Sequence, residues 1–172
     1  MSFLNIEIKA RCKDAGFISD YLLQNADFKG TDYQTDTYFN VTNGRLKLRE
    51  GVIENNLIFY ERNNQAGPKP SHFHLVPVPD AQSLKEVLTR SSGIKVIVKK
   101  KRSIYFIENV KFHIDEVEGL GLFVEIEASN IQTDLPEQHL QMQCDYYRRE
   151  FHIQDEDLIA VSYSDMLLGS TQ

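Results

Sequence analysis

The sequence predicts an α+β fold in which about eight antiparallel strands close into a barrel, with helices packed outside. Three observations support this prediction. Strand-like segments follow one another at short intervals along the chain. Because alternate side chains of a strand face opposite sides, a charged or polar residue at every second position directs charge to one face. This pattern occurs at residues 5–9, 45–49, 100–102, 113–115 and 125–127, and the basic and acidic segments are largely separate.

The charged faces are compatible with two architectures. Two packed sheets would leave these faces in water, whereas a barrel would enclose them. A solvated sheet face normally mixes both signs of charge with Ser, Thr and Gln, but several segments here carry one sign. This separation favours a barrel, and a barrel of about eight strands has room inside for one small ligand. The sandwich remains the alternative.

Apolar periodicity and turn residues give the expected order of elements. We expect strands at residues 3–11, 35–40, 46–50, 57–62, 72–78, 95–101 with a continuation to 108, 110–117 and 122–128. Residues 63–70 contain Gly67, Pro68 and Pro70 and are expected to form a loop. Helices are expected from an Asp14 cap to residue 25, from Asp80 to residue 91, from an Asp134 cap to residue 151, and from residue 155 to 168.

Composition excludes several classes of protein. The chain has 172 residues, which fits a single domain over residues 1–172. It has no apolar run of the roughly 20 residues that a membrane span needs, and its net charge of -6 argues against an extended nucleic-acid surface. The first residues lack the features of a secretory signal, so we expect a cytoplasmic protein. Cys12 and Cys144 form no Cys-x-x-Cys pair and are expected to be reduced.

Carboxylates gather on strands expected near the end of the chain. Glu125 and Glu127 share one strand face, Asp115 lies on the preceding strand, and Glu7 is a further candidate. Carboxylates on neighbouring strands can hold one divalent ion, and an oxygen-only set suits Mg²⁺ or Mn²⁺ rather than zinc. A solvated acidic face is the alternative for these residues. A weaker alternative is a nitrogen-rich metal site made of His72, His74 and His113.

Cations whose position matches the charged face lie mostly on other strands. They are Lys9, Lys47, Arg49, Arg62, Lys100 and Arg102. Arg binds phosphate oxygens with two parallel hydrogen bonds and Lys acts as a point charge, so the set can bind a flexible polyphosphate. Like charges about 5 Å apart repel by roughly 3 kcal/mol at an effective dielectric of about 20, so we expect strain in an empty site. Together with the carboxylates, these cations predict a metal-dependent enzyme that acts on a polyphosphate.

Seven motifs follow one another along nearly the whole chain, at residues 6–9, 38–39, 45–50, 59–62, 98–102, 113–121 and 123–127. In type and order they resemble the CYTH superfamily of triphosphate tunnel metalloenzymes, which includes class IV adenylate cyclases and thiamine triphosphatases. Residues 67–71 and 162–167 resemble the class IV cyclase branch most. The resemblance implies an eight-stranded tunnel, a Mg²⁺ or Mn²⁺ cofactor and a homodimer.

The resemblance also implies residue roles. It assigns metal binding to Glu7, Asp115, Glu125 and Glu127. It assigns triphosphate binding to Lys9, Lys47, Arg49, Arg62, Lys69, Lys100 and Arg102, and catalysis to Glu7, Lys9, Arg102 and Asp115. One position departs from the family motif Glu-x-Glu-x-Lys, because Asn5 replaces the first Glu. An Asn offers a carbonyl oxygen without a negative charge, so we expect weaker metal binding there.

The cyclase resemblance implies that ATP is converted to 3′,5′-cyclic AMP and pyrophosphate. Two alternatives use the same cavity. One is a triphosphatase that hydrolyses thiamine triphosphate or inorganic tripolyphosphate. The other is a protein that binds polyphosphate or nucleotide without catalysis. The expected partner in every case is ATP or another triphosphate, with neither nucleic acid nor a membrane involved.

Overall fold

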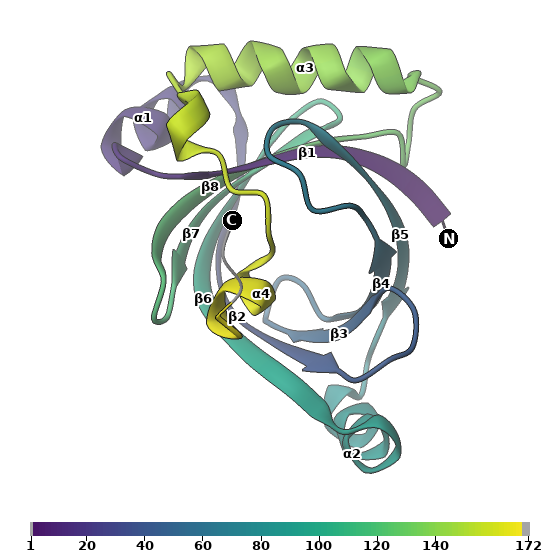
Figure 1. The fold of residues 1–172 in the computed structure, drawn as a ribbon. Helices are drawn as coiled ribbons and strands as arrows, with labels where there is room; N and C mark the ends of the chain where they lie inside the picture. Colours follow the sequence, from purple (N-terminus) through teal and green to yellow (C-terminus); the bar gives the residue numbers. More distant parts are fainter. Residues whose placement is uncertain (1, 170–172) are drawn as a thin grey trace.

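Eight strands form one closed antiparallel barrel (Figure 1). The computed structural model describes residues 2–169. The strands are β1 (Ser2–Arg11), β2 (Asp27–Phe39), β3 (Arg45–Glu50), β4 (Asn56–Glu61), β5 (Lys69–Pro77), β6 (Ile94–Ile107), β7 (Val110–Val117) and β8 (Gly121–Ser129). Their order around the barrel is β1-β5-β4-β3-β2-β6-β7-β8, and β8 pairs with β1 to close it. The predicted barrel is therefore confirmed, and the sandwich is excluded.

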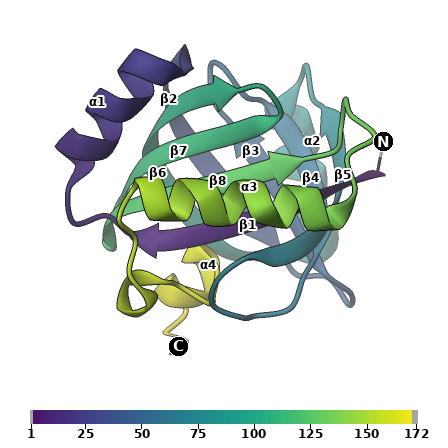
Figure 2. The same cartoon turned by 90° about the horizontal axis from the view of Figure 1, so that it is seen from above.

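The main hydrophobic core lies outside the barrel wall. Strand alternation turns Ile6 and Ile8 of β1 and Ile126 of β8 outward, where they pack with Leu140 of α3 (Glu137–Glu150). Figure 2 shows α3 lying along β1 and β8. Complete burial of one such aliphatic side chain contributes about 1.5–3 kcal/mol. Because this external layer supplies apolar burial, the interior of the barrel can be ionic.

Helix caps follow the predictions at two of three sites. Asp14 accepts a hydrogen bond from Phe17 N at the start of α1 (Ala15–Asn25), and Asp80 accepts one from Ser83 N at the start of α2 (Ala81–Ser92). The predicted Asp134 cap is wrong, because α3 has Pro136 as its N-cap and no side-chain cap bond. Among residues 2–169, no helix is long and apolar enough to cross a membrane.

Two strand boundaries differ from the predictions. Strand β2 begins at Asp27 rather than at residue 35, since it pairs with β6 from Asp27 to Phe39. Its inward-facing residues Asp32 and Gln34 are buried and polar, so the apolar pattern used to predict strands is absent there and only a two-residue polar spacing remains. Strand β5 begins at Lys69, inside the segment predicted as a loop, because residues 69–74 pair with β1.

The predicted helix over residues 155–168 is wrong. A 3-10 turn (Asp155–Asp157) is followed by an extended segment and by the short helix α4 (Tyr163–Leu167). The extended segment pairs with the end of β1, since Ile159 N donates to Lys9 O at 2.9 Å and Leu158 pairs with Ala10. Ser162 then caps α4 by accepting a hydrogen bond from Asp165 N. These bonds bring residues 158–167, the C-terminal segment, to one end of the barrel (Figure 1).

Candidate active site

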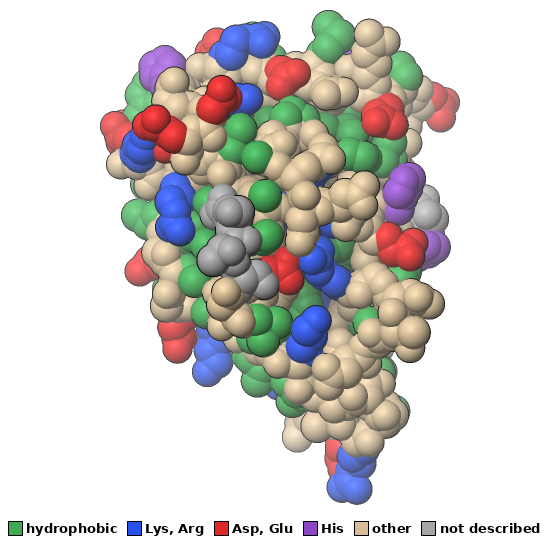
Figure 3. Space-filling model, viewed as in Figure 1, with side chains coloured by type: hydrophobic (Ala, Val, Ile, Leu, Met, Phe, Trp, Pro, Cys, Tyr) green, Lys and Arg blue, Asp and Glu red, His purple; other side chains and the backbone are tan. Residues whose placement is uncertain are grey.

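The barrel encloses a cavity of about 870 Å³. This volume lies within the range of about 300–1,000 Å³ that is common for small-molecule sites. The C-terminal segment lies over one end of the barrel, which we call the covered end, and Figure 3 shows side chains and backbone across this face. At the opposite end the lining continues to Phe3, Leu75 and residues 131–135, which form the rim end. Ser162 and Tyr163 of the C-terminal segment line the cavity at the covered end.

Three cations meet at one buried carboxylate on the wall formed by β2, β3 and β6. Asp36 of β2 is 1% exposed. Arg49 donates to it through Nε and Nη2 at 2.9 and 2.8 Å, and Lys47 Nζ and Lys100 Nζ each lie 2.9 Å from Oδ2. Burial alone would raise the pKa of Asp36, but the three cations hold it well below its usual value. Asp36 therefore remains ionised and offsets the repulsion that we expected between the cations.

Lys100 is charged less readily than an ordinary lysine. Burial lowers its pKa to about 7, because removal from water penalises the ammonium, while the carboxylate of Asp36 opposes this effect. The neighbouring cations Arg49 and Arg102 also lower the pKa of Lys100. The charge on this wall is therefore sensitive to any ligand that adds negative charge.

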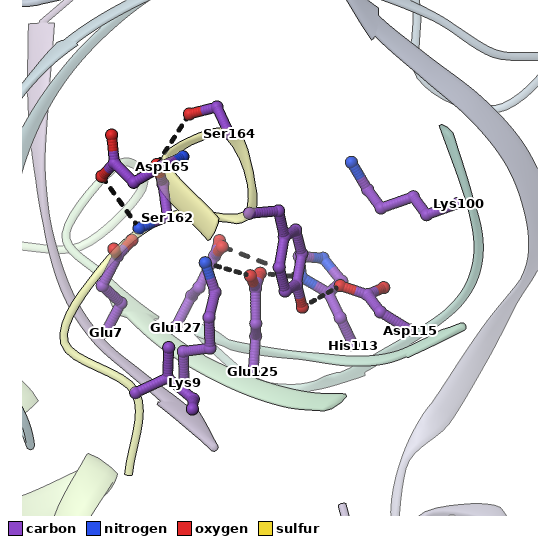
Figure 4. Close-up of polar contacts among 12 residues, drawn as sticks. Glu7, Lys9, Lys100, His113, Asp115, Glu125, Glu127, Ser162, Ser164 and Asp165 are labelled. Atoms are coloured by element: carbon purple, nitrogen blue, oxygen red, sulfur yellow. Dashed lines mark hydrogen bonds and ion pairs between the residues drawn. The ribbon is translucent and has the colours of Figure 1, made fainter. Parts of the chain in front are cut away.

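A second ionic cluster joins β6, β7 and β8 (Figure 4). Arg102 makes two parallel hydrogen bonds to Asp115, at 2.7 and 2.6 Å, and a third to Glu125 at 3.0 Å. The hydroxyl of Tyr163 donates to Asp115 at 2.8 Å. Lys9 lies 3.3 Å from Glu125 and also above the Tyr163 ring, 3.9 Å from its centre. This network brings together three residues predicted as catalytic, namely Lys9, Arg102 and Asp115.

His113, Glu125 and Glu127 form a group that could hold a divalent ion. Their ligand atoms lie within 4.8 Å of one another. Burial lowers the pKa of His113, so its ring is neutral at pH 7, as metal binding requires. Nε2 of this ring is buried and has no hydrogen-bond partner among the described residues. Two carboxylates and an imidazole fit Mn²⁺ well, and Mg²⁺ would use chiefly the carboxylates.

The four carboxylates predicted as metal ligands do not all converge. Glu125 and Glu127 lie in the group with His113, whereas Asp115 is bound by Arg102 and Tyr163. Glu7 lies opposite Glu127 across the β1–β8 ladder and is bound by Arg62. The weaker alternative of a three-histidine site is also not formed, because His72 and His74 lie on β5 and only His113 lines the cavity.

Lys69, a predicted triphosphate-binding residue, is directed at the C-terminal segment. Its Nζ donates to Ile159 O, Ala160 O and Gln65 O at 3.3, 3.0 and 3.2 Å. Burial lowers the pKa of Lys69 to about 7. The other six predicted cations all line the cavity. Lys69 thus links the loop before β5 to the covered end.

The sequence reasoning missed several residues of the cavity or its border, among them Asp36, Glu54 and Tyr163. Asp36 could have been found, because Asp32, Gln34 and Asp36 repeat the two-residue polar spacing of the other strands. Glu54 belongs to the loop between β3 and β4, where no periodicity applies, and it accepts a hydrogen bond from Lys111 at 2.6 Å. Tyr163 was assigned to a long helix, which gave no reason to place it inside a barrel.

An apolar wall lines the part of the cavity nearer the rim end. It consists of Phe3, Ile58, Tyr60, Phe73 and Leu75. The ring of Phe73 stacks between Phe3 and Tyr60, with centroids 5.7 and 5.5 Å away. Because inorganic phosphate gains nothing from such a surface, the wall suits a ligand with an organic group as well as charge.

The fold and the cavity together define a class of protein: a closed β-barrel whose interior offers cations for an anionic ligand beside a group of potential metal ligands. The CYTH domain family matches residues 4–163, and the chain belongs to this family. This is the triphosphate tunnel family, whose members bind triphosphate substrates and depend on metal ions. The family resemblance inferred from the motifs is thus confirmed.

Individual relatives are distant. A Methanocaldococcus jannaschii protein named "Putative adenylate cyclase" is 28% identical over 142 residues, which cover 73% of this chain and 77% of the relative. A Pyrococcus horikoshii structure has a TM-score of 0.77 at 23% identity, with 94% of this chain and 98% of that one covered. A Hippeastrum structure, described as a "Putative adenylyl cyclase" with a dominant triphosphatase activity, has a TM-score of 0.63 at 17% identity, with 99% and 97% covered. The two structural likenesses show the fold.

Proposed function

We propose that this protein is a divalent-metal-dependent enzyme that binds ATP in the barrel and converts it to 3′,5′-cyclic AMP and pyrophosphate. One observation carries the proposal: a single cavity holds a cationic wall, a group of metal ligands and an apolar wall. Each part matches one part of a nucleoside triphosphate. The name of the Methanocaldococcus jannaschii relative supports the same activity.

The cationic wall would bind the polyphosphate. Lys47 and Lys100 each direct one donor at Asp36, and an ammonium has three, so two remain for phosphate oxygens. Arg62 and Lys9 lie nearer the covered end, where they pair with Glu7 and Glu125. Binding of a polyphosphate would exchange these carboxylate contacts for phosphate contacts. The exchange keeps the cations paired, which limits the cost of leaving charges buried.

His113, Glu125 and Glu127 would hold the metal, with Glu7 and Asp115 as adjacent carboxylates. A divalent ion would stabilise negative charge that develops on the phosphates. The cations of the wall act in the same direction, since fixed charges in a site shielded from water stabilise a developing anion. Their contribution is to hold the triphosphate in one conformation and to stabilise the departing pyrophosphate.

Cyclisation needs no protein nucleophile. The ribose 3′-oxygen forms a bond to the α-phosphorus while the bond between that phosphorus and the oxygen bridging to the β-phosphorus breaks. Pyrophosphate takes the electrons of the broken bond, and the hydroxyl proton passes to water at the rim end. The protein contributes orientation, because the apolar wall and the cations fix the two ends of the nucleotide.

A triphosphatase is the second candidate. It would use the same residues, but water would attack the terminal phosphate. The description of the Hippeastrum protein favours this reaction. The apolar wall favours an organic triphosphate, such as thiamine triphosphate, over inorganic tripolyphosphate as its substrate. A third candidate, a binder without catalysis, is favoured by Asn5, which brings no charge to the metal side of the cavity.

Product analysis tests the three candidates. The protein is incubated with Mn²⁺ and ATP labelled on the α- and γ-phosphates, and in parallel with tripolyphosphate and thiamine triphosphate. Labelled cyclic AMP and pyrophosphate are the expected products. Release of the γ-phosphate alone identifies a triphosphatase. Thermal stabilisation by ATP without any product, under Mg²⁺ or Mn²⁺, identifies a binder.

A pair of lysine variants provides the control. Lys47→Met removes a cation from the cavity, and we expect a loss of about 10- to 100-fold in kcat/KM for any of these substrates. Lys85→Met removes a lysine of α2 that pairs with Glu50 outside the cavity, and we expect activity within about twofold of the native protein. Equal activity of the two variants would contradict the proposed site.

A further inference from the structure

Asp36 occupies a position that no metal or phosphate contact explains. It is a carboxylate on the wall proposed to bind an anion, and its negative charge would repel that anion. It is nevertheless 1% exposed, more buried than the side chains of Lys47 and Arg49 and as buried as that of Lys100. It does not line the cavity, whereas Lys47, Arg49 and Lys100 do. The carboxylate thus lies behind the cations as seen from the cavity.

The sheet register explains how one carboxylate of β2 contacts cations on two neighbouring strands, β3 and β6. Asp36 lies opposite Arg49 of β3 on one side and Val98 of β6 on the other. Lys100 is two residues along β6 from Val98, and Lys47 is two residues along β3 from Arg49, so both share the inward face with Asp36. All three cations are therefore within reach of its two oxygens, which accept four hydrogen bonds of 2.8–2.9 Å.

These contacts fix the geometry of flexible side chains. Lysine and arginine lose considerable rotamer freedom when they are held in one conformation. In this wall Asp36 already imposes that order in the free protein. Arg49 uses Nε and Nη2 for Asp36, which sets the plane of its guanidinium. A polyphosphate would then meet cations that are already convergent.

We propose that Asp36 is a positioning residue of the triphosphate site, which gathers Lys47, Arg49 and Lys100 into one phosphate-binding surface. The inference rests on the proposed binding of a triphosphate in the barrel, and not on whether cyclisation or hydrolysis follows. The alternative is a simple electrostatic effect, in which Asp36 only competes with the anionic ligand for the three cations. The two views predict opposite effects of removing the charge.

Calorimetry with inorganic tripolyphosphate, without metal and at low ionic strength, separates these views. Asp36→Asn keeps the size of the side chain but removes its charge. If Asp36 positions the cations, the affinity falls by about tenfold or more although the site gains a net positive charge. If Asp36 is only a competing counter-ion, Asp36→Asn binds tripolyphosphate as tightly as the native protein or more tightly, and the proposal is overturned.

Two further variants keep the result interpretable. Asp157→Asn removes another buried carboxylate, which pairs with Lys13 at 2.7 Å outside the cavity, and we expect affinity within about twofold of native. Asp36→Glu retains the charge but moves it by one methylene, and we expect an affinity between those of the native protein and Asp36→Asn. If Asp36→Asn does not fold, an Asp36→Glu affinity equal to or above native overturns the proposal.

Double substitution tests whether Asp36 acts through its neighbours. Because the two residues share one interaction, the effects of Asp36→Asn and Lys100→Met on affinity should be less than additive. Additive effects would show that Asp36 acts independently of Lys100 and would overturn the positioning role. If native protein binds neither tripolyphosphate nor ATP, with or without Mn²⁺, both this inference and the proposed function fail. If it binds tripolyphosphate but forms no product from ATP, only the catalytic proposal fails.

Discussion

Single carboxylates in this barrel each serve several cations. Glu125 is within ion-pair distance of Lys9 and Arg102 and contacts the neutral ring of His113, and Asp36 binds three cations on the opposite side. Burial raises the pKa of Glu125, but its cationic neighbours outweigh this effect and hold it well below its usual value. Substitution of one such carboxylate therefore leaves several buried charges without a partner, which costs more than the loss of one pair.

Substitution of Asn5 tests whether residue 5 contributes to metal binding in the cavity. Its side chain lines the cavity, and its Oδ1 is buried without a hydrogen-bond partner among the described residues. We predict that Asn5→Glu raises the affinity for Mn²⁺ by about tenfold, because it adds a negative charge to the acidic side. Calorimetric titration with Mn²⁺ measures the change.

Asn5→Gln serves as the control, since it lengthens the side chain without adding charge. We expect its Mn²⁺ affinity to stay within about twofold of that of the native protein. An Asn5→Glu variant that binds Mn²⁺ no better than Asn5→Gln would contradict the assignment of residue 5 to the metal side.

The lowered pKa of Lys100 leads to a prediction for how stability and polyphosphate affinity change with pH. Its folded pKa of about 7 lies below the usual 10.5, so between these values the unfolded chain binds more protons than the native one. Stability of the ligand-free protein should therefore rise with pH through this window. A bound polyphosphate favours the charged lysine, so its affinity should fall by about tenfold from pH 7 to 9, with proton uptake on binding.

Calorimetry of tripolyphosphate binding in two buffers of different ionisation enthalpy measures this proton uptake. Lys100→Met should bind fewer protons than the native protein, and the difference corrects for protons exchanged by the ligand itself. Lys69 has a similarly lowered pKa and contributes to the pH dependence of stability, but its ammonium is directed at carbonyl groups. An identical proton uptake in both proteins would show that Lys100 does not take up a proton on binding and would contradict this prediction.

At the scale of elements, the C-terminal segment completes the ionic network. The strand-like pairing of Leu158 and the cap at Ser162 place Tyr163 against Phe123 and Asp115. Burial and the nearby carboxylates raise the pKa of Tyr163 well above its usual value, so its hydroxyl keeps its proton and donates a hydrogen bond to Asp115. A short segment remote in sequence thus fixes a carboxylate of the barrel.

Tyr163→Phe tests this link because it removes only the hydroxyl. A buried hydrogen bond to a charged group contributes about 1.5–3 kcal/mol, so we predict that Tm falls by roughly 3–12 °C. Tyr33→Phe is the matched control, since Tyr33 is 71% exposed, and its Tm should change by less than about 2 °C. A native Tm for Tyr163→Phe would show that Asp115 does not depend on this hydroxyl.

Helices and strands could not be predicted correctly where tertiary contacts, rather than the spacing of apolar residues, decide the local structure. The alternating charges of β1 and β3 were visible because Glu7, Lys9, Lys47 and Arg49 alternate with apolar residues. Residues 155–168 have apolar spacing near that of a helix, but pairing with the end of β1 draws the chain into an extended form. A single sequence does not reveal such a competing partner.

At the scale of the whole molecule, the barrel and most of its ionic interior could be predicted from the sequence. Strand alternation was sufficient to group the cations on one face, because which face a side chain occupies depends only on its position along its own strand. Which carboxylate each cation meets was not predictable, since that depends on register and on strand order. The three contacts of Asp36 join strands β2, β3 and β6, although β6 is more than fifty residues from β2 along the chain.

The position of the C-terminal segment over one end of the barrel affects how ligands enter and leave the cavity. If the C-terminal segment closes the covered end to a triphosphate, the substrate and both products of the proposed reaction would pass through the rim end. In the proposed cyclisation, a polyphosphate directed toward Lys9 and Arg62 would leave the cyclic nucleotide between pyrophosphate and the rim end. The proposed reaction would then release the cyclic nucleotide before pyrophosphate, and the next ATP would bind only after pyrophosphate has left.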